Sequence, residues 1–155
     1  MTDPNDGLDP SVRRMIDEQA VRDVVVRYFV GVDRLDPELI GSAYHPDAID
    51  DRGRHTFEGA TAGPDIVASN RRSMTSTRHH VTSQLVELDG DAARCETYCL
   101  GVHVTAGDAP QRMQTASRYL DELEKRDGEW RFVRRRSVMD FIRLSSLDDE
   151  GRGGR

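Results

Sequence analysis

The chain has 155 residues, a length typical of one domain built around a single hydrophobic core. Apolar residues make up 36% of it and charged residues 32%, so the composition is that of a folding chain rather than a disordered one. The net charge is -6 and no long block of like charges occurs, which predicts neither a nucleic-acid partner nor a polybasic membrane surface.

The sequence also argues against a membrane segment or a secreted protein. No apolar stretch approaches the roughly 18 residues needed to span a bilayer, and the acidic N-terminus does not resemble a signal peptide. We therefore expect a cytoplasmic protein. Cys95 and Cys99 lie four apart in a predicted strand, a separation of about 13 Å that is too long for a disulfide, so both are expected as buried or half-buried thiols.

The two ends of the chain are polar and rich in Gly, Asp, Ser and Arg. Residues 1–8 are predicted to be an N-terminal tail, and residues 143–155 a C-terminal tail that either stays mobile or folds over a pocket as a lid. No repeat or linker divides the stretch between them, so residues 9–142 are predicted to form one domain.

Helix signals fill the first half of the chain. Asp9-Pro10 is an N-cap followed by proline at the first helical position, and apolar residues then recur at three- and four-residue spacing, which predicts a long amphipathic helix with a break near Glu18. The same signal at Asp36-Pro37 opens a short helix that His45-Pro46 ends. A third helix is expected after Gly63-Pro64.

From His79 onward the pattern changes to extended runs joined by turns. Asp-Gly pairs at 89–90 and 127–128 are hairpin signals. The order of helices followed by an antiparallel meander predicts an α+β fold, with helices packed on one face of a curved sheet. The expected strands cover residues 79–88, 92–105, 111–124 and 129–142.

Asp33 is the most informative residue of the first helix. Val26, Phe29 and Val30 precede it at seven, four and three residues, and they place it on an apolar stripe. A carboxylate removed from water needs a partner, so an inward Asp33 would be paired or functional. The alternative is an exposed carboxylate at the last turn of the helix.

Two adjacent histidines begin the first predicted strand. The side chains of His79 and His80 must point to opposite faces, so one of them can look inward. An imidazole is the commonest general base in enzymes, although a histidine in a strand also serves as a structural hydrogen-bonding residue.

Motifs for metals and nucleotides are absent from the sequence. The five histidines have no metalloprotease or zinc-finger spacing, and although His79 and His103 could meet across neighbouring strands, we predict no metal. Glycine-rich phosphate motifs and nucleophile elbows are also missing, so no cofactor is expected. The basic run at 134–136 is predicted to be a solvated strand edge.

Five segments in order resemble the SnoaL-like group of the nuclear transport factor two superfamily, over about residues 15–142. This group includes polyketide cyclases, scytalone dehydratase, a bile-acid dehydratase and a hexachlorocyclohexane dehydrochlorinase. The resemblance implies a cone-shaped curved antiparallel sheet wrapped around the N-terminal helices, with a pocket inside its open end. The segments are AVRDVVVRYFVGVDRLD, HPDA followed by FEGATAGPDI, HHVTSQLVELDGDAA, SRYLDELEKRDGEWRFV and RRRSVMDF.

The resemblance also implies site residues. Asp33 corresponds to the catalytic aspartate of the dehydratase and dehydrochlorinase members, and His79 to their catalytic histidine. The family usually has asparagine four residues after this histidine, where the present chain has Ser83, so His80 remains the alternate.

Four further residues are predicted to bind the substrate. Tyr28 matches a polar cavity residue five before the aspartate, and Arg135 matches an arginine five after the last tryptophan. Asp50 belongs to a polar group with Asp51, Arg52 and His55 that we expect at the pocket mouth, and His103 is expected on a neighbouring strand.

The leading functional hypothesis is a cofactor-free lyase or isomerase of the dehydratase, elimination or cyclase type, acting on a small, cyclic, apolar molecule through an Asp-His dyad. One alternative is a ligand-binding or accessory domain without catalysis. Another is the small subunit of a ring-hydroxylating dioxygenase, which would require a large partner chain.

Self-association through the sheet is expected as well. Apolar residues occur on both strand faces, with Val81 and Leu85 predicted on one and Val86 and Leu88 on the other. Family members are commonly dimers or trimers, so the resemblance implies a homodimer or homotrimer.

Overall fold

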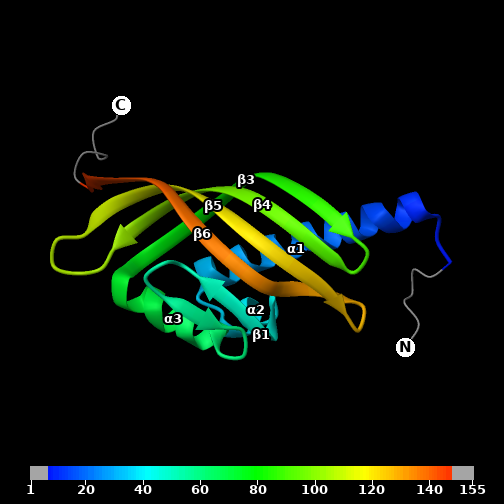
Figure 1. Cartoon of the computed structure of the whole chain (residues 1–155). Helices are drawn as coiled ribbons and strands as arrows, with labels where there is room; N and C mark the ends of the chain where they lie inside the picture. Colours follow the sequence, from blue (N-terminus) through cyan, green and yellow to red (C-terminus); the bar gives the residue numbers. More distant parts are fainter. Residues whose placement is uncertain (1–6, 148–155) are drawn as a thin grey trace.

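The computed structural model describes residues 7–147 and has the predicted α+β class. The six strands form one sheet in the order β2-β1-β6-β5-β4-β3, antiparallel except for the parallel pair β1 and β6 (Figure 1). The elements are α1 (Pro10–Arg34), α2 (Pro37–Gly41), β1 (Tyr44–Asp51), β2 (Thr56–Glu58), α3 (Ala62–Ser73), β3 (Met74–Asp89), β4 (Ala92–Thr105), β5 (Gln111–Arg126) and β6 (Glu129–Ser146).

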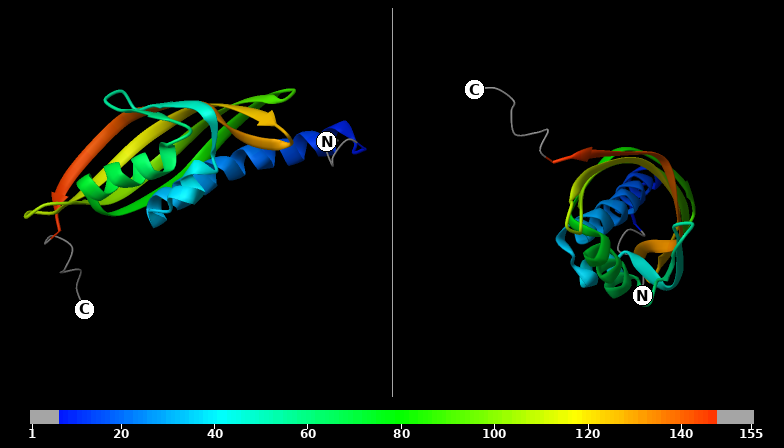
Figure 2. Two further views of the ribbon diagram at one scale, coloured as in Figure 1. Left: turned by 90° about the horizontal axis from the view of Figure 1, so that it is seen from below. Right: turned by 90° about the vertical axis from the view of Figure 1, so that its left-hand side faces the viewer.

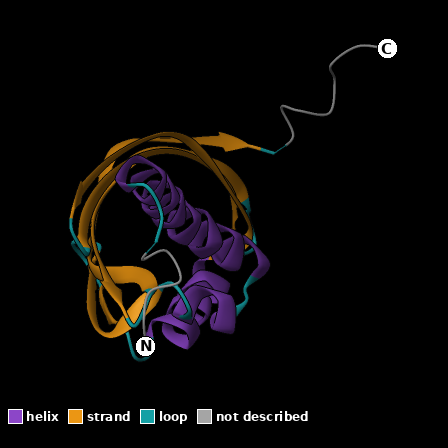
Figure 3. Cartoon of the chain, turned by 90° about the vertical axis from the view of Figure 1, so that its right-hand side faces the viewer, coloured by secondary structure: helices purple, strands orange, loops and turns teal. Residues whose placement is uncertain are grey.

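The sheet curls around helix α1, and α2 and α3 lie on the side that the sheet leaves open (Figures 2 and 3). The apolar core fills the space between α1 and the inner face of the sheet. At one end of this core the buried carboxylate of Asp17 accepts hydrogen bonds from the indole of Trp130 at 2.8 Å and the ammonium of Lys125 at 3.1 Å. These contacts fasten the first half of α1 to β5 and β6.

Helix α1 begins as the sequence predicts but runs without interruption. The carboxylate of Asp9 caps it by accepting from the amide of Ser11 at 2.8 Å, and Pro10 occupies the first turn. The break expected near Glu18 is absent. Glu18 instead forms ion pairs with Arg14 and Arg22 at four-residue spacing, which support a continuous helix.

Strand β1 was not predicted. The sequence suggests a helix from Asp36-Pro37 to His45-Pro46, but α2 ends at Gly41 and residues 44–51 form a strand that pairs with β6. Proline cannot donate a ladder hydrogen bond, and the register shifts between Tyr44 and Ile49, around Pro46. Local sequence conceals this strand because its pairing partner lies some 90 residues further along the chain.

The four long strands follow the prediction with wider limits. β4 matches residues 92–105, whereas β3 begins five residues early and β6 continues to Ser146, which pairs with Gln111. The predicted domain, which ends at residue 142, is therefore too short, because residues 143–146 belong to the sheet. The predictions of a tail for residues 1–6 and of a tail or lid for 148–155 lie outside the described residues.

A bulge changes the predicted facing of β3. The register shifts between Val81 and Ser83, so Val81 packs against the core while Leu85 is 62% exposed on the outer face. The grouping of Val81 with Leu85 is therefore wrong. Cys95 and Cys99 are buried free thiols on one face of β4, as expected. Within residues 7–147 no helix is long and apolar enough to cross a membrane.

Candidate functional site

Asp33 and His79 meet where the end of α1 reaches the edge of the sheet. An oxygen of the Asp33 carboxylate lies 2.6 Å from Nδ1 of His79. The same carboxylate accepts from the backbone amide of His79 at 2.9 Å and from the hydroxyl of Thr77 at 3.0 Å. The contact expected between carboxylate and imidazole is thus present, and the catalytic role of the pair stays a prediction.

The topology explains this geometry. β3 is an edge strand, so the backbone amides along its free edge have no neighbouring strand to pair with. The Asp33 carboxylate takes the place of that strand at His79. This one carboxylate therefore both holds α1 against the sheet and orients the imidazole.

The electrostatics of the pair favour an ionised Asp33. Burial by itself raises the pKa of this carboxyl group, but hydrogen bonds from the side chain and backbone of His79 and from Thr77 outweigh burial, and the pKa lies below its usual value. The side chains of Asp33 and His79 are 18% and 12% exposed, respectively. The pair is therefore largely buried but still accessible to solvent.

His103 is the second histidine of the site. Its ring lies 5.1 Å from that of His79 in an edge-to-face arrangement, and its Nε2 is 3.4 Å from the hydroxyl of Thr115. Burial, followed by the neighbouring His79, lowers the pKa of His103 to about 4, so it is neutral at pH 7. Its Nδ1 is buried and has no hydrogen-bond partner within the described part of the chain.

His80, the alternate to His79, is exposed and faces away from the dyad. Gly101 lies opposite His79 on β4 and leaves room for the His103 ring, because a Cβ there would be 2.3 Å from Nε2 of His103. The structure therefore brings together Asp33, His79 and His103 and leaves His80 outside.

Arg135 lies in a second, fully buried cluster. Its guanidinium donates to both oxygens of Asp121, at 2.7 and 2.8 Å, and both side chains are 0% exposed. The guanidinium carbon lies 4.1 to 4.8 Å from the ring centroids of Tyr28, Phe132 and Tyr119. Although burial disfavours the charge, Asp121 raises the pKa of Arg135 overall.

The prediction that residues 134–136 form a solvated strand edge is wrong for the middle arginine. β6 is an interior strand between β1 and β5 rather than an edge. Arg134 and Arg136 are exposed on its outer side, and Arg135 between them points inward by the two-residue alternation of a strand.

Asp50 and Tyr28 complete the second cluster. One oxygen of Asp50 accepts from the hydroxyl of Tyr44 at 2.7 Å and from Arg52 at 2.9 Å, and Arg52 also donates to the hydroxyl of Tyr28 at 2.6 Å. Asp50 is completely buried, so its predicted place at a polar pocket mouth is wrong. Its own strand carries it inward, while Asp51 and His55 stay exposed.

One aromatic side chain separates the two clusters. The ring of Phe29 lies 5.0 Å from that of His79 and 5.4 Å from the guanidinium carbon of Arg135. The predicted site residues thus divide into a dyad group and a buried group that contains Tyr28, Asp50 and Arg135. The two groups share only their contacts with Phe29 within the described part of the chain.

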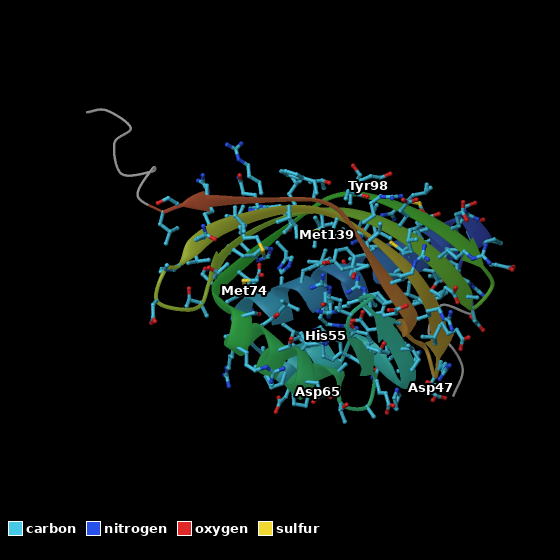
Figure 4. The ribbon with its side chains drawn as sticks, turned by 60° about the vertical axis from the view of Figure 1, so that its left-hand side comes forward. Asp47, His55, Asp65, Met74, Tyr98 and Met139 are labelled. Atoms are coloured by element: carbon cyan, nitrogen blue, oxygen red, sulfur yellow. The ribbon has the colours of Figure 1, made fainter. Side chains whose placement is uncertain are left out.

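Apolar side chains occupy the sheet beyond the dyad. Met139, Ile142 and Leu144 on β6 are half exposed and pair in register with Ser117, Thr115 and Met113 on β5. Figure 4 labels Met139 on this part of β6 and Tyr98 on the outer side of the sheet. A pocket of about 300 Å³ beside the dyad is lined by Val30, Asp33, Arg34 and Arg78.

The described residues contain no group of three or more His, Cys, Asp or Glu side chains placed to hold a metal ion.

The comparisons with known proteins agree with this architecture. Residues 13–136 match the family model of the SnoaL-like domain. The chain belongs to the SnoaL-like domain family. No curated protein matches it.

Solved structures that resemble this SnoaL-like domain include two hexachlorocyclohexane dehydrochlorinases. LinA type 2 is 22% identical with a TM-score of 0.82, over 88% of this chain and 94% of that chain. LinA type 3 from Novosphingobium barchaimii LL02 is 22% identical with a TM-score of 0.81, over 88% and 95%. A candidate scytalone dehydratase from Novosphingobium aromaticivorans DSM 12444 is 17% identical with a TM-score of 0.77, over 88% and 93%. Identities at this level establish the shared fold alone.

Several residues of the SnoaL-like site were missed from sequence. Asp121 was overlooked although Tyr119 and Leu123, two residues to either side, mark the inward face of β5. Thr77 and Thr115 carried no signal, because small hydroxyl residues are common in strands. Tyr44 was assigned to a helix, so its inward direction could not be inferred.

Proposed function

We propose that this SnoaL-like domain is a cofactor-free lyase or isomerase in which His79 is the general base and Asp33 orients it. The observation that supports this most strongly is the 2.6 Å contact between Asp33 and Nδ1 of His79. It fixes the proton on Nδ1 and leaves Nε2 as the basic atom. Within residues 7–147, Nε2 has no hydrogen-bond partner that would compete with a substrate.

The proposed reaction begins with removal of a proton from a carbon next to a carbonyl group or leaving group. Nε2 of His79 takes this proton, and the electron pair of the broken C–H bond forms a new C=C bond as the leaving group departs with its own pair. Asp33 stabilises the imidazolium that results. In a dehydration the imidazolium returns the proton to the departing hydroxyl, so water leaves and His79 is regenerated.

His103 is proposed to bind the substrate as a neutral group. A pKa of about 4 keeps it uncharged at pH 7, and its buried Nδ1 lacks a partner among the described residues. A neutral imidazole beside His79 can hydrogen-bond to a substrate oxygen without adding a competing charge. Tyr28, Asp50 and Arg135 lie buried on the other side of Phe29, and their contact with a substrate stays a prediction.

The structural neighbours are consistent with this reaction class. Their names denote a dehydrochlorinase and a candidate dehydratase, and both activities are eliminations. Isomerisation and cyclisation begin with the same proton transfer, so the dyad supports them equally. A small, cyclic and mainly apolar substrate fits the half-exposed Met139, Ile142 and Leu144 beyond the dyad.

The test is turnover by the dyad variants. A substrate is first sought among hydroxy-ketones, polyketide intermediates and steroid-like compounds. Each compound is tested for raising the melting temperature of the protein and for conversion to a product detected by mass spectrometry. His79→Ala and Asp33→Asn should each reduce turnover by about 10² to 10⁴-fold, and the double variant should be scarcely worse.

His80→Ala is the matched control, because it removes the exposed neighbouring histidine. Turnover at the level of the unsubstituted chain in either single dyad variant would contradict the proposal and favour a binding domain.

We further propose a homodimer or homotrimer that covers the outer face of the sheet. The large side chains of Leu85, Tyr98 and Leu100 lie on that face and are 62%, 48% and 50% exposed, respectively. Light scattering should give a multiple of the 17.5 kDa chain mass at micromolar concentration. A single species of chain mass would reject the oligomer.

A further inference from the structure

Thr77 lies two residues before His79 on β3, and its hydroxyl reaches the dyad. The hydroxyl oxygen is 3.0 Å from Oδ1 of Asp33, the same carboxylate oxygen that lies 2.6 Å from Nδ1 of His79. Both side chains point to one face of β3 by the two-residue alternation of a strand. Thr77 is 7% exposed, so its hydroxyl is largely shielded from water.

The hydroxyl of Thr77 is the donor in this contact, because an ionised carboxylate can only accept. Burial raises the pKa of Asp33, and the hydrogen bonds from His79 and Thr77 together outweigh burial and lower it. Oδ1 therefore accepts two hydrogens, one from the hydroxyl and one from the imidazole. The other oxygen, Oδ2, accepts from the backbone amide of His79 at 2.9 Å.

Two donors on one oxygen weaken each other. Each hydrogen draws electron density from Oδ1, so the carboxylate stabilises an imidazolium less than it would with the imidazole as the single donor to that oxygen. The Thr77 hydroxyl therefore opposes protonation of His79. It also limits rotation of the Asp33 carboxylate, whose terminal torsion is otherwise broad, and so keeps Oδ1 aimed at Nδ1.

The other groups around the imidazole contribute less charge at pH 7. On the inner face of β4, burial lowers the pKa of His103 to about 4 and raises that of the Cys99 thiol to about 11, so both are neutral. Arg34 and Arg78 line the pocket beside Asp33 but are exposed, so water and salt screen them. Among the described residues, Asp33 is the charged group in hydrogen-bond contact with the imidazole.

We infer that Thr77 is a positioning residue that sets the basicity of His79 by sharing Oδ1 of Asp33. A general base works only in its unprotonated form, so a hydroxyl that opposes protonation extends the range of pH over which the imidazole can accept a proton. The inference rests on the proposed function, in which His79 removes a proton from the substrate. The interaction itself belongs to the unliganded protein and is measured without a substrate.

The experiment follows protonation of His79 by two-dimensional proton–nitrogen NMR in the unsubstituted chain and in Thr77→Val. Valine keeps the branched shape and places a methyl group where the hydroxyl stood. The midpoint of the His79 titration should move to higher pH by about 0.5 to 1 pH unit, because Oδ1 then accepts from the imidazole alone. An unchanged midpoint, or a midpoint that moves to lower pH as a loosened dyad would give, would overturn the inference.

Three further variants separate the hydroxyl from the packing of the side chain. Thr77→Ser keeps the donor and should keep the midpoint of the unsubstituted chain. Thr77→Ala removes the donor without filling its place, so the midpoint should rise by less than in Thr77→Val, because water can enter. Thr75→Val is the matched control and should leave the midpoint unchanged, since the exposed Thr75 donates to the carbonyl of Val104 at 3.4 Å. A lower midpoint in Thr77→Ala would contradict the role of the hydroxyl even if Thr77→Val did not fold.

Turnover gives a second readout once a substrate is found. Well below the midpoint, kcat/KM of Thr77→Val should be about threefold to tenfold lower than that of the unsubstituted chain, and well above it the two should agree within about twofold. An equal loss at every pH would indicate a structural role and overturn the inference.

The NMR result and the dyad test fail separately. A raised midpoint in Thr77→Val together with unchanged turnover in His79→Ala would keep the interaction and remove His79 as the base. An unchanged midpoint together with lost turnover in His79→Ala would remove the role of Thr77 and keep the dyad.

Discussion

Two pairs of titratable side chains lie on either side of Phe29, and they differ in burial and in how many of their polar atoms form hydrogen bonds. In the pair of Arg135 and Asp121 both carboxylate oxygens are bound, both side chains are fully buried and aromatic rings cover the guanidinium. In the pair of Asp33 and His79 the carboxylate is satisfied, but one ring nitrogen of the imidazole is open and both side chains keep some exposure.

The contrast separates a pair whose charges are fixed by burial from one whose imidazole can exchange a proton. A buried pair in which both carboxylate oxygens are hydrogen-bonded resists any change of protonation, because the proton would have to leave a charged partner in an apolar place. A partly exposed imidazole with one open nitrogen can gain and lose a proton while its partner stays ionised. The following predictions test this division, beginning with the largest expected effect.

Breaking the buried pair should cost the most stability. Arg135→Met leaves the Asp121 carboxylate buried without a partner, and the free energy of unfolding should fall by about 3 to 5 kcal/mol in urea titrations at pH 7. Arg136→Met removes an exposed arginine next in the chain and should change it by less than about 0.5 kcal/mol. Similar losses in the two variants would contradict the contrast.

His103 should make stability depend on pH. Its pKa is about 4 in the folded chain against 6.5 for a free histidine, so the unfolded chain takes up this proton first as the pH falls. Above pH 6.5 His103 is neutral in both the folded and the unfolded chain and does not change the free energy of unfolding. Between pH 6.5 and pH 4 its protonation in the unfolded chain lowers the free energy of unfolding, by up to about 3 kcal/mol. Urea unfolding between pH 7 and 4.5 should show a shallower decline in His103→Gln, and an identical decline would contradict the assignment.

Crowding the second histidine should have an intermediate effect. Gly101→Ala places a Cβ 2.3 Å from Nε2 of His103 and 2.4 Å from the Thr115 hydroxyl, so both must move, at a cost of about 1 to 3 kcal/mol. Gly41→Ala is the control, because nothing lies within 4 Å of the added atom. Thermal unfolding of the two variants should differ by several degrees, and equal melting temperatures would show that the His103 region yields easily.

Neutralising the dyad should affect stability least. Asp33→Asn keeps one acceptor oxygen at the edge of β3, and the pair is only partly buried, so the loss at pH 7 should be about 1 kcal/mol. The lowered pKa of Asp33 means that its contribution is present above about pH 4 and is lost as the pH falls further. A loss as large as that of Arg135→Met would give Asp33 a mainly structural role.

Much of the fold could be predicted because its signals are local. Asp9-Pro10 marks the start of α1 through a cap and a proline, and the Asp-Gly turns mark the hairpins of β3 to β6. These features depend on a few neighbouring residues. The family resemblance, which rests on ordered segments, supplied the cone and the positions of Asp33 and His79, and family membership is supported by the match over 13–136.

The sequence by itself determined which residues alternate along each strand, and hence that Cys95 and Cys99 share a face and that only one of His79 and His80 can point inward. It did not determine which strand lies beside which. Only the tertiary structure sets β1 against β6, which turns Arg135 from an expected edge residue into a buried one and brings Asp50 next to it. Strand pairing over long sequence separations is decided by burial and hydrogen bonding of the whole sheet, and the balance of charges inside the cone follows from that pairing rather than from any local pattern.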